Sequence, residues 1–150
     1  MYPTKYIPKT LSEQDKMKQL KMLNKSKKLY RQQKYYTRKK VSSYKYKPSN
    51  HIINAKKMYG VSNVLPNKEL ANVTGCSIPA LQKIVNKGEG AYYSSGSRPN
   101  QTAQSWGIAR LASAITAGNA SIVDYHILKT CDKTKRAYKL ATKKYNSRKT

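Results

Sequence analysis

The basic residues of this chain are concentrated at its two ends and leave a nearly neutral middle. Residues 1–60 hold 17 basic and 2 acidic side chains, residues 61–128 hold 5 and 3, and residues 129–150 hold 9 and 1. Segments with so many like charges and so few apolar side chains do not bury themselves unaided. The charge pattern therefore limits the packed core to residues 61–128 and predicts two basic arms, one at each end.

The formal net charge is +25, from 31 Lys and Arg against 6 Asp and Glu. Such a balance is typical of proteins that bind polyanions. Nucleic acid, an anionic membrane surface and acidic protein surfaces would all satisfy it, and charge alone does not choose among them. The N-terminus lacks the apolar segment of a signal peptide, and no apolar run is long enough to cross a bilayer. We therefore expect neither a leader nor a membrane span.

The neutral middle contains a stretch typical of two short helices joined by a tight turn, NKELANVTGCSIPALQKIVNKG at residues 67–88. Asn67 can cap the first helix, and Gly75 can leave it in a left-handed conformation. Ser77 can cap the second helix, and Gly88 is expected to end it. These signals predict a helical hairpin.

The hairpin resembles the helix-turn-helix of bacterial repressors over about twenty residues. The resemblance implies a recognition helix over residues 77–87. Its outward polar side chains would be Ser77, Gln82, Lys83, Asn86 and Lys87. An ordinary helical hairpin needs the same residues, and Ile78 and Pro79 occupy the turn that normally meets base edges. A structural hairpin and a DNA-reading hairpin both remain open at this point.

Capping residues and apolar spacing predict further helices outside the hairpin. They cover residues 12–36, 51–59, 103–116, 120–128 and 137–145. In the first, Ser12 is the cap and Asp15 is expected to reach back to it. A narrow apolar stripe of that helix, expected to face a partner, comprises Met17, Leu20, Leu23 and Tyr30. Trp106 is expected to be buried in a central helix. The fold class predicted is mainly α: a small helical domain containing a helix-turn-helix-like hairpin, with extended basic N- and C-terminal arms.

Tyrosine is the dominant aromatic residue, with 13 copies against one Trp and no Phe. Eight of the 13 lie in residues 1–60, interleaved with lysine, and tyrosine suits interfaces better than deep cores. Arg98 stands out in a glycine- and serine-rich loop predicted over residues 88–102. The side chains expected to bind a partner or nucleic acid are Lys27, Lys28, Arg31, Tyr35, Tyr36, Arg38, Lys39, Lys40, Tyr44, Tyr46, Gln82, Lys83, Lys87 and Arg98.

Catalytic and metal-binding patterns are weak. His51 and His126 are the two histidines, and Asp124 lies two residues before His126, a spacing that points the two side chains in different directions on a helix. The loop at 88–102 lacks the spacing of a phosphate-binding P-loop. We predict no enzyme, no metal, no cofactor and no small-molecule substrate. Two cysteines, Cys76 and Cys131, are too few for a disulfide framework and are expected to stay reduced.

Several stretches together resemble a family of small basic proteins encoded by large nucleocytoplasmic DNA viruses, such as the chlorella-infecting phycodnaviruses. The resemblance is carried by YIPKTLSEQDKMKQLKMLNKSKKLY, YYTRKK, HIINAKKMYGV, GAYYSSGSRPNQTAQSWGIARLASAIT and VDYHIL, which span nearly the whole chain. It implies a viral setting more than a mechanism.

Two functions follow from that setting. In the first, the chain is a virion structural protein, a minor capsid protein assembled in the host cytoplasm and placed on the inner surface of the capsid. Its arms would cement neighbouring major and minor capsid proteins or the underlying inner membrane. In the second, it is a DNA-binding protein that packages the genome or regulates it through the hairpin, with phosphate contacts that weaken with salt.

Overall fold

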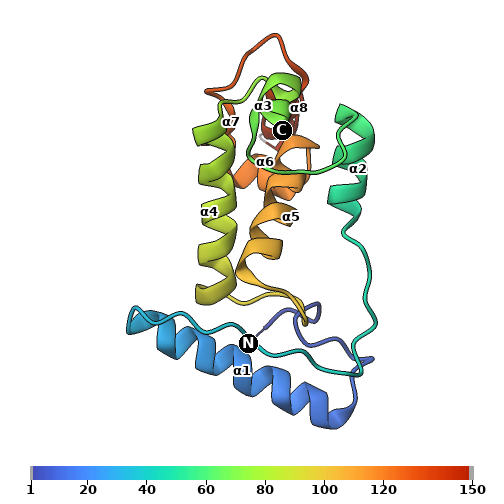
Figure 1. The fold of residues 1–150 in the computed structure, drawn as a ribbon, viewed down its shortest axis with the longest axis vertical. Coiled ribbons are helices and arrows are strands. Elements are labelled where there is room, and N and C mark those ends of the chain that lie inside the picture. The colour runs from blue at the N-terminus through green and yellow to red at the C-terminus, as the bar shows by residue number, and fades with distance from the viewer. Residues whose placement is uncertain (1, 149–150) are drawn as a thin grey trace. The chain divides into compact units, whose positions relative to one another are not determined.

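The computed structural model describes residues 2–148, and over that range the chain is helical with no strand (Figure 1). The mainly α fold class is therefore confirmed. The helices are α1 (Glu13–Arg31), α2 (Asn50–Tyr59), α3 (Lys68–Thr74), α4 (Ile78–Ser94), α5 (Ala103–Ile115), α6 (Asn119–Val123), α7 (Tyr125–Leu128) and α8 (Arg136–Arg148).

Two compact units make up the described chain, and each is built from two separate segments. Unit 1 combines residues 2–47 with residues 89–106, and unit 2 combines residues 48–88 with residues 107–148. These units do not follow the predicted boundaries at residues 60 and 128. The division into units depends on contacts between residues that are far apart in sequence. A count of charges along the chain cannot detect such contacts.

The segments predicted as arms are folded into these units. In unit 1, Leu11, Met22 and Val41 form a buried cluster. In unit 2, α8 buries Ala137 and Ala141 in the main core. Lysine-rich helices pack in this way because small or apolar residues line one face while the long lysine stems carry their charges to solvent. The extended arms are therefore corrected to packed segments, the first built around α1 and the last around α8.

Charge is shared almost equally between the units. By formal count of the sequence, unit 1 contains 16 basic and 3 acidic residues, a net of +13, and residues 48–88 and 107–148 of unit 2 contain 14 and 3, a net of +11. The nearly neutral stretch of sequence at residues 61–128 is thus not a neutral body, since basic residues of 129–148 join it in unit 2. Each unit presents a strongly cationic surface.

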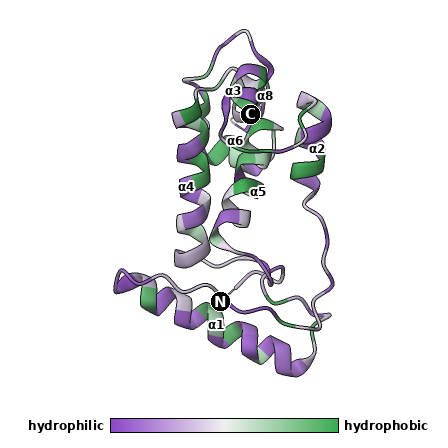
Figure 2. Ribbon diagram, viewed as in Figure 1, coloured by the Kyte–Doolittle hydropathy of each residue, from purple (hydrophilic) through white to green (hydrophobic). Residues whose placement is uncertain are grey.

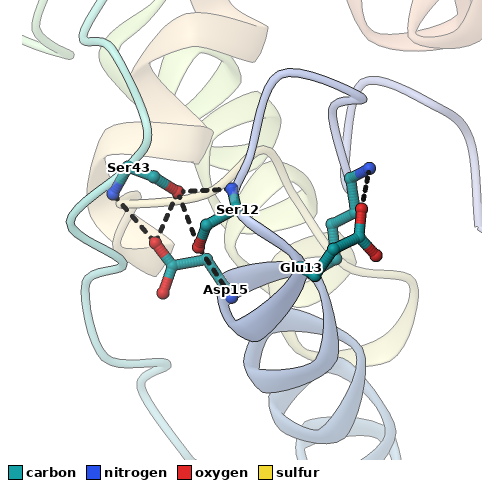
Figure 3. Close-up of polar contacts among 5 residues, drawn as sticks. Ser12, Glu13, Asp15 and Ser43 are labelled. Atoms are coloured by element: carbon teal, nitrogen blue, oxygen red, sulfur yellow. Dashed lines mark hydrogen bonds and ion pairs between the residues drawn. The ribbon is translucent and has the colours of Figure 1, made fainter.

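Helix α1 begins at the predicted cap, where the Ser12 side chain accepts a hydrogen bond from the Asp15 amide. The Asp15 carboxylate does not reach back to the cap as expected. It accepts hydrogen bonds from the Ser43 amide at 2.8 Å and the Ser43 hydroxyl at 2.5 Å (Figure 3). These hydrogen bonds hold the pKa of Asp15 below its ordinary value. The N-terminus of α1 is thereby tied to the segment that follows the helix.

The buried face of α1 shares only Leu23 with the apolar stripe, which was expected to face a partner and not the core of this chain. It comprises Gln19, Met22, Leu23 and Ser26. Met17 and Leu20 are instead 55% and 36% exposed, and Figure 2 shows α1 as largely hydrophilic with short hydrophobic bands. Gln19 and Ser26 are buried because they donate hydrogen bonds to the carbonyls of Tyr6 and Tyr93, so polar side chains replace part of the expected stripe.

The predicted hairpin is present in unit 2 as α3, a turn and residues 78–88 of α4. The Asn67 side chain accepts from the Leu70 amide, Gly75 has φ of 78°, and the Ser77 hydroxyl accepts from the Ala80 amide. Gly88 does not end α4, which continues to Ser94. A Cβ on Gly88 would lie 2.6 Å from the Cα of Gly107, so this glycine permits close helix approach rather than a cap.

The core of unit 2 is aliphatic and is closed by a disulfide. Leu70 of α3, Leu81 of α4 and Leu111 of α5 are fully buried within it. Cys76, in the hairpin turn, is bonded to Cys131, which follows α7. The prediction that both cysteines stay reduced is therefore wrong. Sequence spacing carries no signal of this pairing, because the fold brings together residues 55 positions apart.

Trp106 is half-buried, not central. It contacts the ring of Tyr6 edge-to-face in unit 1, with centroids 6.0 Å apart. We expect Trp106→Ala to lower the free energy of unfolding by about 2 kcal/mol, less than the roughly 3–5 kcal/mol of a fully buried ring. Urea denaturation followed by far-UV circular dichroism checks this, and a loss near 5 kcal/mol would contradict partial exposure.

Candidate functional site

Most of the predicted contact residues lie in unit 1, and most of them are exposed. The exposed ones are Lys28, Arg31, Tyr35, Lys39, Lys40, Tyr46 and Arg98 in unit 1, with Gln82, Lys83 and Lys87 in unit 2. The half-buried ones are Lys27, Tyr36 and Tyr44. Arg38 alone among them is buried. Unit 1 is therefore where a polyanion would find the densest group of these side chains.

Three tyrosines meet at the end of α1, and we call Tyr30, Tyr35 and Tyr93 the tyrosine cluster. Tyr30 lies in the last turn of α1, Tyr93 in the last turn of α4, and Tyr35 in the segment that follows α1. The Tyr35 and Tyr93 centroids are 5.1 Å apart, and the Tyr30 and Tyr93 rings are nearly parallel at 6.1 Å. Tyr35 is 72% exposed. The cluster is therefore an aromatic surface open to solvent.

A local turn of the backbone brings Tyr35 back onto α1. The Gln32 and Lys34 amides both donate to the Leu29 carbonyl, and the Gln33 amide donates to the Tyr30 carbonyl. Gln33 adopts a left-handed φ of 62°, which reverses the chain. α1 consequently ends at Arg31 instead of the predicted Tyr36, because this turn uses up its last carbonyls.

Cations flank the tyrosine cluster in sequence along the same stretch. Arg31 and Lys34 adjoin Tyr30 and Tyr35 in sequence, and both are exposed. On α1, the Lys27 ammonium lies 4.4 Å from the centre of the Tyr2 ring, and Lys25 lies 4.5 Å from that of Tyr36. These pairs are cation–π contacts. Basic side chains with aromatic rings between them form a surface suited to phosphates and flat ligands.

Acidic residues are few near the cluster. Glu13 and Asp15 lie in the first turn of α1, at the opposite end of a helix about 28 Å long. Glu89, on α4, is the acidic residue of unit 1 nearest to Tyr93 in sequence. One carboxylate, that of Glu89, therefore lies within one helical turn of Tyr93, against a net charge of +13 for unit 1.

Arg38 is part of the support of this surface and not of its exposed face. Its guanidinium donates to the Ser26 hydroxyl and the Tyr92 carbonyl at 2.9 Å, and to the Ser97 hydroxyl at 2.8 Å. It also lies 3.8 Å from the centre of the Tyr92 ring. Burial lowers the pKa of this guanidinium, although an arginine stays protonated. The prediction that Arg38 contacts a partner is corrected, because its charge is enclosed.

Tyr92 connects Arg38 to the tyrosine cluster. Its hydroxyl accepts from the Arg38 amide and donates to the Gln101 carbonyl, and its ring meets Tyr93 edge-to-face at 5.1 Å. Tyr30, Tyr92, Tyr93, Lys25 and Lys34 were absent from the predicted contact set. Tyr92 and Tyr93 could have been found from the sequence, because they form a pair of adjacent tyrosines inside a glycine-rich stretch.

The polar face of the hairpin is less free than the helix-turn-helix resemblance implies. The Gln82 amide donates to the Asn86 side chain at 2.9 Å, and the Lys87 ammonium lies 4.0 Å from the buried carboxylate of Asp124. Lys135 and Asp132 cover the turn: a Cβ on Gly75 would lie 2.6 Å from the Lys135 Cγ. Gln82, Lys83 and Lys87 are nevertheless exposed on α4.

Residues 2–148 contain no cluster of three or more His, Cys, Asp or Glu side chains that could hold a metal ion. Asp124 is engaged by the Arg110 guanidinium through two hydrogen bonds of 2.8 Å. Within the same described range, none of the helices is both long and apolar enough to cross a membrane.

Comparison with known proteins assigns the chain to a family but gives no activity for it. No curated protein matches the chain, and no solved structure matches it. A family described as of unknown function, DUF5824, matches residues 3–136, which is most of the sequence. The chain therefore belongs to this family of unknown function, DUF5824.

Proposed function

We propose that this protein is a non-enzymatic nucleic-acid-binding protein that holds phosphates with the exposed lysines and arginines of unit 1. The observation that carries the proposal is the tyrosine cluster, an open aromatic surface flanked in sequence by exposed cations in a unit of net charge +13. In nucleic acid, phosphates lie next to flat aromatic bases. Nucleic acid therefore matches both the exposed cations and the aromatic surface of unit 1.

Binding of this kind depends little on sequence. Lysines on flexible stems contact phosphates without reading bases, and each contact releases counterions from the nucleic acid. The hairpin adds little base reading, since Gln82 is bonded to Asn86 within its own helix. The affinity should therefore fall steeply with salt and vary little among sequences.

The paired charge reversal Lys28→Glu with Arg31→Glu tests this proposal. Both side chains are exposed on α1, so the fold should be kept, while two phosphate contacts become repulsive. We expect duplex DNA affinity to fall about tenfold or more at 0.1 M salt, and the slope of log K against log salt to become shallower by about two. Fluorescence anisotropy with a labelled duplex measures both quantities.

The matched control is Lys56→Glu with Lys57→Glu, which makes the same charge change on exposed positions of α2 in unit 2. A clearly smaller loss in this control supports binding through unit 1. An equal loss in the two variants would mean that only the overall charge attracts DNA. Absence of binding by the unmodified protein would refute the proposal.

A minor capsid protein of a large DNA virus is the second candidate. The resemblance to proteins of such viruses favours it, as does the irregular segment after α1, where Tyr46 is 76% exposed between Lys45 and Lys47. Its partners would be major and minor capsid proteins or the inner membrane surface. The packed state of residues 2–47 weakens it, because cementing by long extended arms needs those residues free. Retention in the shell fraction of virions stripped of DNA would favour it over genome binding.

A further inference from the structure

We infer that the tyrosine cluster is a stacking site for unpaired bases, so that unit 1 prefers single-stranded nucleic acid to duplex. The inference rests on the proposed function and names the class of nucleic acid that the same surface takes. Tyr35 receives the base, while Arg31 and Lys34 hold the neighbouring phosphates.

Tyr35 has the exposure that stacking requires. It contacts Tyr30 and Tyr93 at tilts of 51° and 47°, and 72% of its surface remains accessible. The ring is thus braced by two partners and still available to a ligand. An aromatic ring held in place loses little conformational entropy when a base stacks on it.

The support under Tyr35 is firm. Tyr93 is held edge-to-face by Tyr92, whose side chain is fully buried and hydrogen-bonded to the Arg38 amide and the Gln101 carbonyl. The turn at Gln33 fixes where the chain returns. A surface tyrosine on a loose loop has no such frame, so this site is built in advance of its ligand.

Charge and stacking together distinguish the two forms of nucleic acid. In a duplex the base faces are covered by their neighbours, and only phosphates can meet unit 1. In a single strand the bases can turn outward, and base–aromatic stacking adds to the phosphate contacts without regard to sequence. Removing the Tyr35 ring should therefore weaken single-strand binding and leave duplex binding intact.

The test compares Tyr35→Ala with the unmodified protein, using a labelled thymidine oligomer of about 16 nucleotides and a duplex of equal length. Single-strand affinity should fall roughly 5- to 100-fold, as expected from the loss of one stacked base. Duplex affinity should stay within about twofold. Tyr35→Trp should restore single-strand binding, since indole stacks at least as well as phenol.

Val123→Ala is the control, because Val123 is an apolar side chain of unit 2 that is 62% exposed and lies outside the predicted contact set, and it should leave both affinities unchanged. A wild-type single-strand affinity for Tyr35→Ala would overturn the inference and leave the proposed function standing. Equal loss on both ligands would also overturn it, because the ring would then not act by stacking. Failure of the unmodified protein to bind either ligand would refute the proposed function itself.

Discussion

Replacing Cys76 and Cys131 together by alanine should lower the free energy of unfolding by about 4 kcal/mol. The disulfide closes a loop between residues 55 positions apart, and the entropy that such a loop removes from the unfolded chain corresponds to this value. Both cysteines are buried, so the folded state also loses packing around the sulfurs. Chemical denaturation of the oxidised protein and of the double variant gives the difference.

A reducing agent supplies the control for this prediction. Reduction should destabilise the unmodified protein by a similar amount and leave the double variant unaffected. Two thiols that react in the folded protein before any reductant is added would show that the cysteines are free, as was expected from their number alone. Insensitivity of the unmodified protein to reductant would lead to the same conclusion.

A comparable loss, about 3–5 kcal/mol, is expected for Arg38→Met. Methionine fills much of the space but removes three hydrogen bonds from a charged donor, each worth roughly 1.5–3 kcal/mol before relaxation. The Tyr92 carbonyl, in the last turn of α4, would then lose this partner. Trp106, the single tryptophan, lies in unit 1, which also contains Arg38. Its fluorescence during chemical denaturation therefore reports the unfolding of the unit that carries the substitution.

Two further variants sharpen the Arg38 prediction. Arg98→Met makes the same replacement at an exposed position and should change stability by less than about 0.5 kcal/mol. Arg38→Lys keeps the charge but not the planar group that bonds Ser26 and Ser97 at once, so most of the loss should remain. A stable lysine variant would mean that a positive charge is sufficient at this position.

Helix caps were the most predictable part of the fold. The caps Ser12, Asn67 and Ser77 and the left-handed Gly75 all act as expected, because each depends on hydrogen bonds within a few residues. Gly88 looked like another helix end, but its role comes from Gly107 on a different helix. Local chemistry is visible in a sequence, whereas the approach of two helices is not.

The residues of the candidate site also differ in how far the sequence alone could predict them. Arg31 and Tyr35 were predicted to be contact residues because they lie in a stretch rich in lysine and tyrosine, and both are exposed. Arg38 lies in the same stretch, yet Tyr92 and Ser97 from the other segment of unit 1 enclose it. Composition therefore pointed to an exposed stretch, and contacts between distant residues determined which of its cations remain exposed.

The two-segment construction of each unit has a consequence for biosynthesis. Residues 2–47 leave the ribosome well before residues 89–106, so the first part of unit 1 must wait for the second, and unit 2 begins in between. Cutting the chain at residue 60 would remove Ala55 and Tyr59 from the core of unit 2 as well as the longer of the two segments of unit 1. A ribosome that stalls midway would therefore hold two unfinished bodies, both exposing apolar surface, and not one completed domain.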